Sequence, residues 1–181
     1  MVSYNLALAI PTLVAVASAA KNTGPFPLFA YGPGIGGLPL FSTGGMFDLK
    51  QVFIGNFSHS NSSEAAPIEF SVGNGKWLGS PNTTDVNSGR NATWSNYTFA
   101  VPGPSSSSHT VKLVNGTAGD GYVSNFLLYG SFVMLQSDEG FTSLWYASPT
   151  EVKDIYTIGW NASAASDDKV PVTLKSTPPS N

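Results

Sequence analysis

Apolar and polar residues alternate along much of this chain, and this period of two restricts its fold more than any other feature does. In residues 68–72, Ile, Phe and Val alternate with Glu and Ser, and the same pattern runs through 97–101, 156–160 and 170–175. Such alternation is typical of a β-strand with one buried face. Residues 127–135 are apolar at almost every position, which predicts a central strand buried on both faces.

Turn sequences separate these segments at short intervals. Asn74-Gly75 is the strongest of them, because both central residues of a type I′ hairpin turn need positive φ angles. After Ala20, no window of about eleven residues carries an apolar helical pattern free of Gly and Pro, so we expect almost no helix. Shorter apolar runs predict further strands at 27–31, 38–42, 51–54, 76–78, 110–114 and 143–147.

Many short strands without helices predict an all-β protein. We favour a two-sheet antiparallel β-sandwich, and a β-trefoil is the alternative that fits the size and the number of strands. Residues 21–181 are expected to form a single β domain. The Ser-, Asn- and Pro-rich segments 58–66, 80–92 and 102–109 are interpreted as long surface loops, because the pieces between them are too small to fold alone.

Residues 1–20 are predicted to be a secretory signal peptide. An apolar run ends at Ala20, and Ala17-Ser18-Ala19 matches the A-x-A pattern, which predicts cleavage after Ala19 or Ala20. A membrane anchor is the alternative, but a run of about 15 residues is shorter than the roughly 20 that span a bilayer. We expect no membrane span in the mature chain.

The chain also carries seven N-x-S/T sequons, which supports a secreted glycoprotein. Charged residues make up only 10% of the sequence, so attached glycans would supply much of its solubility. The predicted N-glycosylation sites are Asn56, Asn61, Asn82, Asn91, Asn96, Asn115 and Asn161.

Composition excludes several classes of function. The net charge is −3 and Arg90 is the only arginine, so no basic stripe exists to bind nucleic acid. The sequence contains no cysteine and two histidines, which excludes disulfide frameworks, iron–sulfur sites, zinc fingers and thiol catalysis. We therefore expect no cofactor and no metal.

Candidate catalytic groups are few. Glu69 lies on the polar side of its strand and is the carboxylate best placed to line a cleft, whereas the other acidic candidates lie in turns. His59 and His109 lie in serine-rich loops, and the chain has no G-x-S-x-G motif. We interpret all of these as surface residues and predict no catalytic site. The turn carboxylates are Asp138, Glu139, Asp167 and Asp168.

Aromatic residues form 12% of the chain and are the other candidate site, because their rings can stack on sugars. Trp145 and Tyr146 are adjacent, so one should face outward and the other inward. Trp94 lies two residues before the sequon residue Asn96, so in a strand both side chains would point to the same face. Trp94 is therefore expected to be exposed. We predict Trp94, Trp145 and Tyr146 as sugar-stacking residues, and Trp160 as part of the core.

Three segments stand out for their apolar runs and glycine-rich turns, namely GPFPLFAYGPGIGGLPLFSTGG (24–45), GSFVMLQSDEGFTSLWYASP (130–149) and DIYTIGWN (154–161). These segments resemble small secreted proteins of filamentous fungi. More loosely, the layout is similar to that of the phialide-type (PhiA-like) cell-wall proteins. The resemblance implies a glycosylated protein of the wall or extracellular space, and it brings no catalytic residue.

Taken together, the sequence predicts a secreted, N-glycosylated, non-catalytic protein of a fungal cell wall or of the extracellular space. Its expected partner is a cell-wall polysaccharide or another surface protein. The alternative is a lectin-like carbohydrate-binding module or a carbohydrate-active enzyme.

Overall fold

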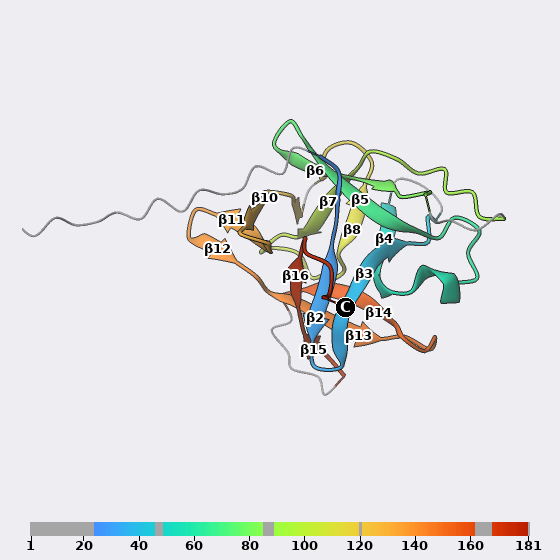
Figure 1. The fold of residues 1–181 in the computed structure, drawn as a ribbon. Coiled ribbons are helices and arrows are strands. Elements are labelled where there is room, and N and C mark those ends of the chain that lie inside the picture. The colour runs from blue at the N-terminus through green and yellow to red at the C-terminus, as the bar shows by residue number, and fades with distance from the viewer. Residues whose placement is uncertain (1–23, 46–48, 85–88, 120, 162–167, 181) are drawn as a thin grey trace, which may run out of the picture.

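The computed structural model of the chain describes residues 24–45, 49–84, 89–119, 121–161 and 168–180. The predicted signal peptide lies outside these ranges. Within them, the regular structure is antiparallel strand apart from one 3-10 helix, η1 (Phe57–His59). The all-β prediction is therefore confirmed (Figure 1). The strands are β1 (Phe26–Pro27), β2 (Phe29–Gly32), β3 (Ile35–Ser42), β4 (Leu49–Gly55), β5 (Ala66–Gly73), β6 (Lys76–Pro81), β7 (Tyr97–Pro102), β8 (Lys112–Val114), β9 (Tyr122–Val123), β10 (Phe126–Tyr129), β11 (Phe132–Ser137), β12 (Gly140–Thr142), β13 (Trp145–Pro149), β14 (Ile155–Trp160), β15 (Val170–Pro171) and β16 (Thr173–Lys175).

The prediction of a plain two-sheet sandwich was wrong, because the strands close into a barrel of six. Going round it, β3 pairs with β5, β5 with β6, β6 with β7, β7 with β8, β8 with β4, and β4 again with β3. Period-two alternation is the same in a sandwich and in a barrel, so the sequence did not distinguish them. The strand order has no threefold repeat in the described residues, which also argues against the trefoil.

A second circuit of strands shares β3 and β4 with the barrel. It runs from β2 through β3, β4, β14 and β13 to residues 170–175, whose two halves, β15 and β16, pair with β13 and with β2. Val172, between the halves, donates its N–H to the carbonyl of Trp145. The segment 170–175 therefore holds the two ends of this circuit together.

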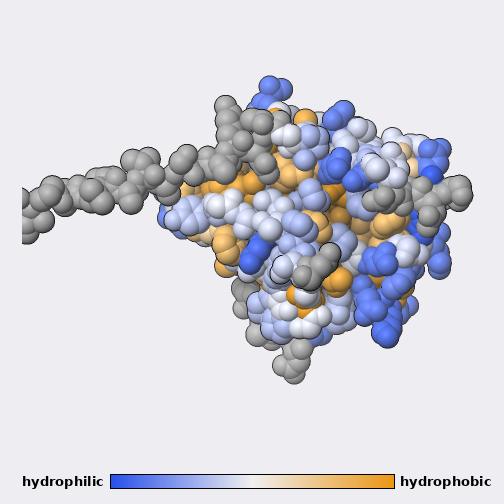
Figure 2. Space-filling view, in the orientation of Figure 1, coloured by the Kyte–Doolittle hydropathy of each residue, from blue (hydrophilic) through white to orange (hydrophobic). Residues whose placement is uncertain are grey.

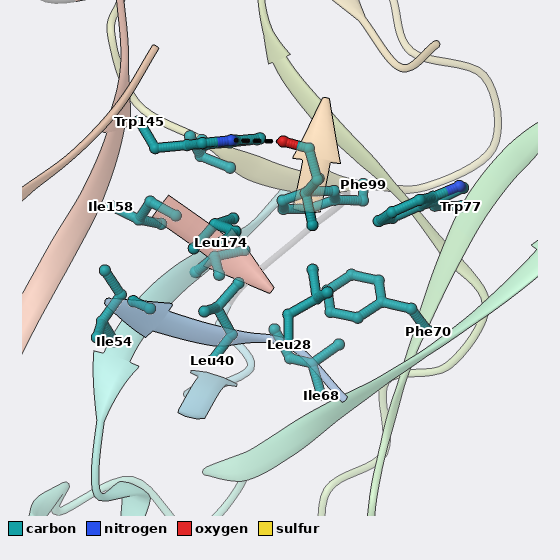
Figure 3. Packing of buried hydrophobic residues seen from close by; sticks show 14 of the residues in the cluster. Leu28, Leu40, Ile54, Ile68, Phe70, Trp77, Phe99, Trp145, Ile158 and Leu174 are labelled. Carbon is teal, nitrogen blue, oxygen red and sulfur yellow. Dashed lines mark hydrogen bonds between the residues drawn. The ribbon is translucent and has the colours of Figure 1, made fainter. Parts of the chain in front are cut away.

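One hydrophobic cluster joins side chains from both circuits. Phe99 from the barrel and Leu174 from the second circuit are fully buried, and Trp145 lies beside them (Figure 3). The indole Nε1 of Trp145 donates a 3.3 Å hydrogen bond to the carbonyl of Val133, so its polar atom is satisfied inside the core. The two circuits are thus packed around a shared interior.

Two hairpins show how local sequence sets the topology. Asn74 and Gly75 have φ angles of 51° and 73° between β5 and β6, as the type I′ prediction requires. Residues 127–135, in contrast, do not form the single central strand that we predicted. Gly130 has a φ of 61° and turns the chain, so that β10 pairs back onto β11. In Figure 1 this hairpin and β12 extend from one side of the molecule.

Candidate binding surface

The hairpin of β10 and β11, together with β12, presents an outward-facing group of apolar side chains. Residues that pair directly across two antiparallel strands lie on the same face of a sheet. The register places Tyr129 opposite Phe132 and Phe141 opposite Gln136. We call this surface the aromatic face, and it consists of Leu127, Tyr129, Phe132, Met134, Gln136 and Phe141.

The intervening residues of the same strands point into the core. Phe126 and Leu128 of β10 are buried, as are Val133 and Leu135, which pair with them on β11. One face of this sheet is therefore fixed by burial in the shared interior, and the aromatic face is the opposite one.

The aromatic face holds all of the highly exposed aromatic side chains in the described residues. Tyr129 is 56% exposed, Phe132 41% and Phe141 53%. Figure 2 shows hydrophobic residues at the surface over β10 and β11. The other large hydrophobic side chains with comparable exposure are aliphatic and lie outside β10, β11 and β12, namely Leu49, Val72, Leu144 and Val152.

Lys175 lies at the side of the aromatic face where β16 pairs with β11. Lys175 of β16 pairs with Phe132 of β11, and its ammonium group lies 4.8 Å from the centre of the Phe132 ring and 4.9 Å from that of Tyr31. Cation–π contacts of this length stabilise both rings in place. The hydroxyl of Tyr31 in turn donates to the carbonyl of Thr177, so the C-terminal segment lies against Tyr31 of β2.

Two of the three predicted sugar-stacking residues are buried. Trp94 is only 2% exposed, and its Nε1 donates a 3.1 Å hydrogen bond to the carbonyl of Glu64. The prediction that Trp94 shares an exposed strand face with Asn96 was wrong, because the φ of 58° at Asn96 is not that of an extended strand. Trp145 is 3% exposed, so neither tryptophan offers a free ring face to a sugar in this conformation.

Tyr146 faces outward, as expected for the neighbour of a buried Trp145. It pairs with Gly159 on β14, and an added Cβ at Gly159 would lie 2.1 Å from Tyr146 Cζ. The ammonium group of Lys169 lies 5.3 Å from the centre of the Tyr146 ring. Burial, and to a lesser degree the carboxylate of Asp168, raise the pKa of Tyr146. This ring is therefore packed between glycine backbone and a lysine.

The loops around Trp94 are organised by the single arginine. Arg90 donates hydrogen bonds to the carbonyls of Ser58, Ser60 and Ser62, and its guanidinium lies 5.5 Å from the centre of the Phe57 ring. The predicted surface loops 58–66 and 80–92 are thus joined to each other. These contacts give Arg90 a structural role.

All seven sequon asparagines lie at the surface. Asn82 is the least accessible, because it is half-buried and its Nδ2 donates a 2.9 Å hydrogen bond to Glu69 Oε1. Asn56 begins η1, and its side chain accepts a hydrogen bond from the N–H of Ser58. The other exposed sequon asparagines are Asn61, Asn91, Asn96, Asn115 and Asn161.

The candidate catalytic groups are dispersed. Glu69 is engaged by Asn82, and Asp138 and Glu139 are exposed in the turn between β11 and β12. His109 Nδ1 lies 3.0 Å from the carbonyl oxygen of Trp160. His59 is exposed in η1, Asp168 is exposed before β15, and Asp167 lies outside the described residues. In the part of the chain that the structure describes, no three His, Asp or Glu residues gather as metal ligands.

One signal for the aromatic face is present in the sequence, although we did not predict the face from it. Gly130-Ser131 is a two-residue hairpin turn, with glycine where a positive φ is needed. Had residues 127–135 been divided there, the register would have placed Tyr129 and Phe132 on one face.

Comparison with known protein families, with curated proteins and with solved structures finds no match for this chain. Across the described ranges, the structure has no helix whose length and apolarity would let it cross a membrane.

Proposed function

We propose that this chain is a secreted, N-glycosylated protein of the extracellular space or a fungal cell wall, where it acts through non-catalytic contacts. The observation that carries the proposal is the position of the sequons. Every one of the seven asparagines lies at the surface, in a loop, in a turn or beside the end of a strand. A glycan needs such a position, because it cannot be accommodated in a packed interior.

The distribution of the sequons gives further support. None lies in the sequence between Asn115 and Asn161, nor in strands β2, β3 and β16. The aromatic face belongs to the first of these segments, so no glycan would be attached to the face itself. An exposed apolar area of this kind marks a site of interaction with a partner. Secretion and the aromatic face together favour a partner outside the cell.

Expression of the full chain in a fungal host tests the proposal. The exported protein should begin at Ala20 or Lys21, and its mass should fall after treatment with an N-glycosidase. Replacing each sequon asparagine by Gln identifies the occupied sites, and Asn125→Gln, at an exposed asparagine outside any sequon, is the control. A chain that stays inside the cell, or that is exported without glycans, would refute the proposal.

The lectin-like alternative is favoured by one specific observation. The three exposed aromatic side chains gather on a single sheet face rather than being scattered over the surface. Exposed aromatic rings are common means of sugar recognition, so this candidate function refines the first.

A further inference from the structure

We infer that the aromatic face binds a neutral polysaccharide, with an extended sugar chain lying along β11. The inference rests on the proposed extracellular role. The first argument is the type of side chain. Tyr129, Phe132 and Phe141 are aromatic, whereas the comparably exposed hydrophobic residues elsewhere in the described chain are aliphatic. A flat ring stacks on the apolar face of a sugar ring, which a branched aliphatic side chain does poorly.

The second argument is spacing. Tyr129 and Phe132 are direct cross-strand neighbours, and Phe141 stands opposite Gln136, four residues further along β11. At about 3.3 Å per residue, the two aromatic positions lie roughly 13 Å apart along the strand. A single sugar ring is shorter than this distance, whereas a short linear oligosaccharide spans it. Gln136, exposed beside Phe141, supplies an amide for sugar hydroxyls.

The third argument is charge. Strands β10, β11 and β12 contain no acidic or basic side chain. The nearest cation by register, Lys175, is held between the rings of Phe132 and Tyr31. An anionic polysaccharide would find no cluster of positive charge on this face, whereas a neutral one needs none.

The fourth argument is access and rigidity. No sequon lies on the strands of this face, so none of the protein's own glycans would be attached to it. The sequon residue Asn161 comes near its end, because its N–H donates to the carbonyl of Leu144, just after β12. The C-terminal segment covers Tyr31 and Gly37 on β2 and β3 instead, through the Tyr31 hydroxyl and Pro179. The inward side chains of β10 and β11 are fixed in the core, so little order has to be gained on binding.

The test uses the secreted, folded protein with insoluble chitin, cellulose and β-1,3-glucan, and with linear oligosaccharides of increasing length. We expect retention on at least one polymer and affinity that rises with oligosaccharide length until both aromatic positions are spanned. Phe141→Leu keeps an apolar side chain but removes the ring, and it should weaken binding about tenfold. Phe141→Trp should retain binding.

Val72→Ala is the matched control, since Val72 is also a strand residue and is 55% exposed. It should bind as the unaltered protein does. Retention by none of the three polymers, or equal binding by Phe141→Leu, would overturn the inference. A dimer in sedimentation that Phe141→Leu dissociates would instead identify a second copy as the occupant. Export and glycan mass are measured on the same sample. A failure of the proposed secretion and glycosylation is therefore distinguished from a failure of polysaccharide binding.

Discussion

Asn82 Nδ2, the atom that would carry a glycan, donates a 2.9 Å hydrogen bond to Glu69 Oε1 on the neighbouring strand β5. The one carboxylate that the sequence placed in a strand therefore has a structural partner. Its contact joins the end of β6 to β5, because the N–H of Asn82 also donates to the carbonyl of Pro67.

Two substitutions at position 69 distinguish the effect of the carboxylate charge on stability from the effect of the hydrogen bond that Glu69 accepts. Glu69→Gln keeps an oxygen that accepts from Asn82, so its free energy of unfolding should change by no more than about 0.5 kcal/mol. Glu69→Ala leaves the half-buried amide without this partner and should cost about 1 kcal/mol. Urea denaturation of protein made without glycans measures both, with Glu139→Gln as an exposed control. A larger loss for Gln than for Ala would contradict this account.

Replacement of either Trp94 or Trp160 by Ala should destabilise the protein strongly. Both side chains are at most 4% exposed, and truncating a buried tryptophan typically costs about 3–5 kcal/mol through lost burial and the cavity that remains. The sequence pattern predicted an exposed Trp94, for which truncation would have a mild effect, so this is the more informative of the two variants. Thermal denaturation provides the measurement. A Trp94→Ala melting temperature close to that of the unaltered protein would contradict the burial of Trp94 among these loops.

Gly159 and Tyr146 should show coupled effects on stability. Gly159→Ala places a methyl group against the Tyr146 ring and should cost about 1–3 kcal/mol. Tyr146→Ala removes the ring, so adding Gly159→Ala to it should cost much less than in the unaltered protein. A double-mutant cycle from denaturation data gives the coupling free energy. Strictly additive effects would mean that the ring does not lie over the glycine.

The raised pKa of Tyr146 predicts a loss of stability at alkaline pH. The folded protein holds the phenolic proton more tightly than the unfolded chain does, so the free energy of unfolding falls as pH rises above about 10 and until Tyr146 ionises in the fold. Tyr146→Phe should remove this part of the pH dependence. Asp168→Asn should lower the Tyr146 pKa, since it removes the smaller of the two causes. Ultraviolet titration of tyrosinate, compared between variants, follows the change directly.

Strand positions were predictable from the sequence because each alternating segment is a local pattern. The prediction that Trp160 belongs to the core is confirmed, since it is buried, and Ile158 on the same side of the strand is buried too. Tyr156, two residues earlier on that side, is only half-buried. Which strands pair is set by contacts between segments far apart in sequence, such as residues 170–175 with β2 and β13. No local pattern records that choice, and for this reason the barrel was not predicted.

The site was predicted less well, for a related reason. Parity assigns two faces to a strand but does not say which is buried, and it fails across a residue such as Asn96 with positive φ. Trp94 was misplaced in this way. Tyr129 and Phe132 were missed because a long apolar run hides a turn when its only marker is Gly130-Ser131.

The joining role of residues 170–175 has a consequence for the timing of synthesis. These residues follow every other strand that the structure describes, so the second circuit cannot close while they are still being translated. In a secreted chain, the sequons from Asn56 to Asn161 would thus reach the glycosylating enzyme before the domain is complete. Even the Asn82 amide, engaged by Glu69 in the finished fold, would then be available to receive a sugar.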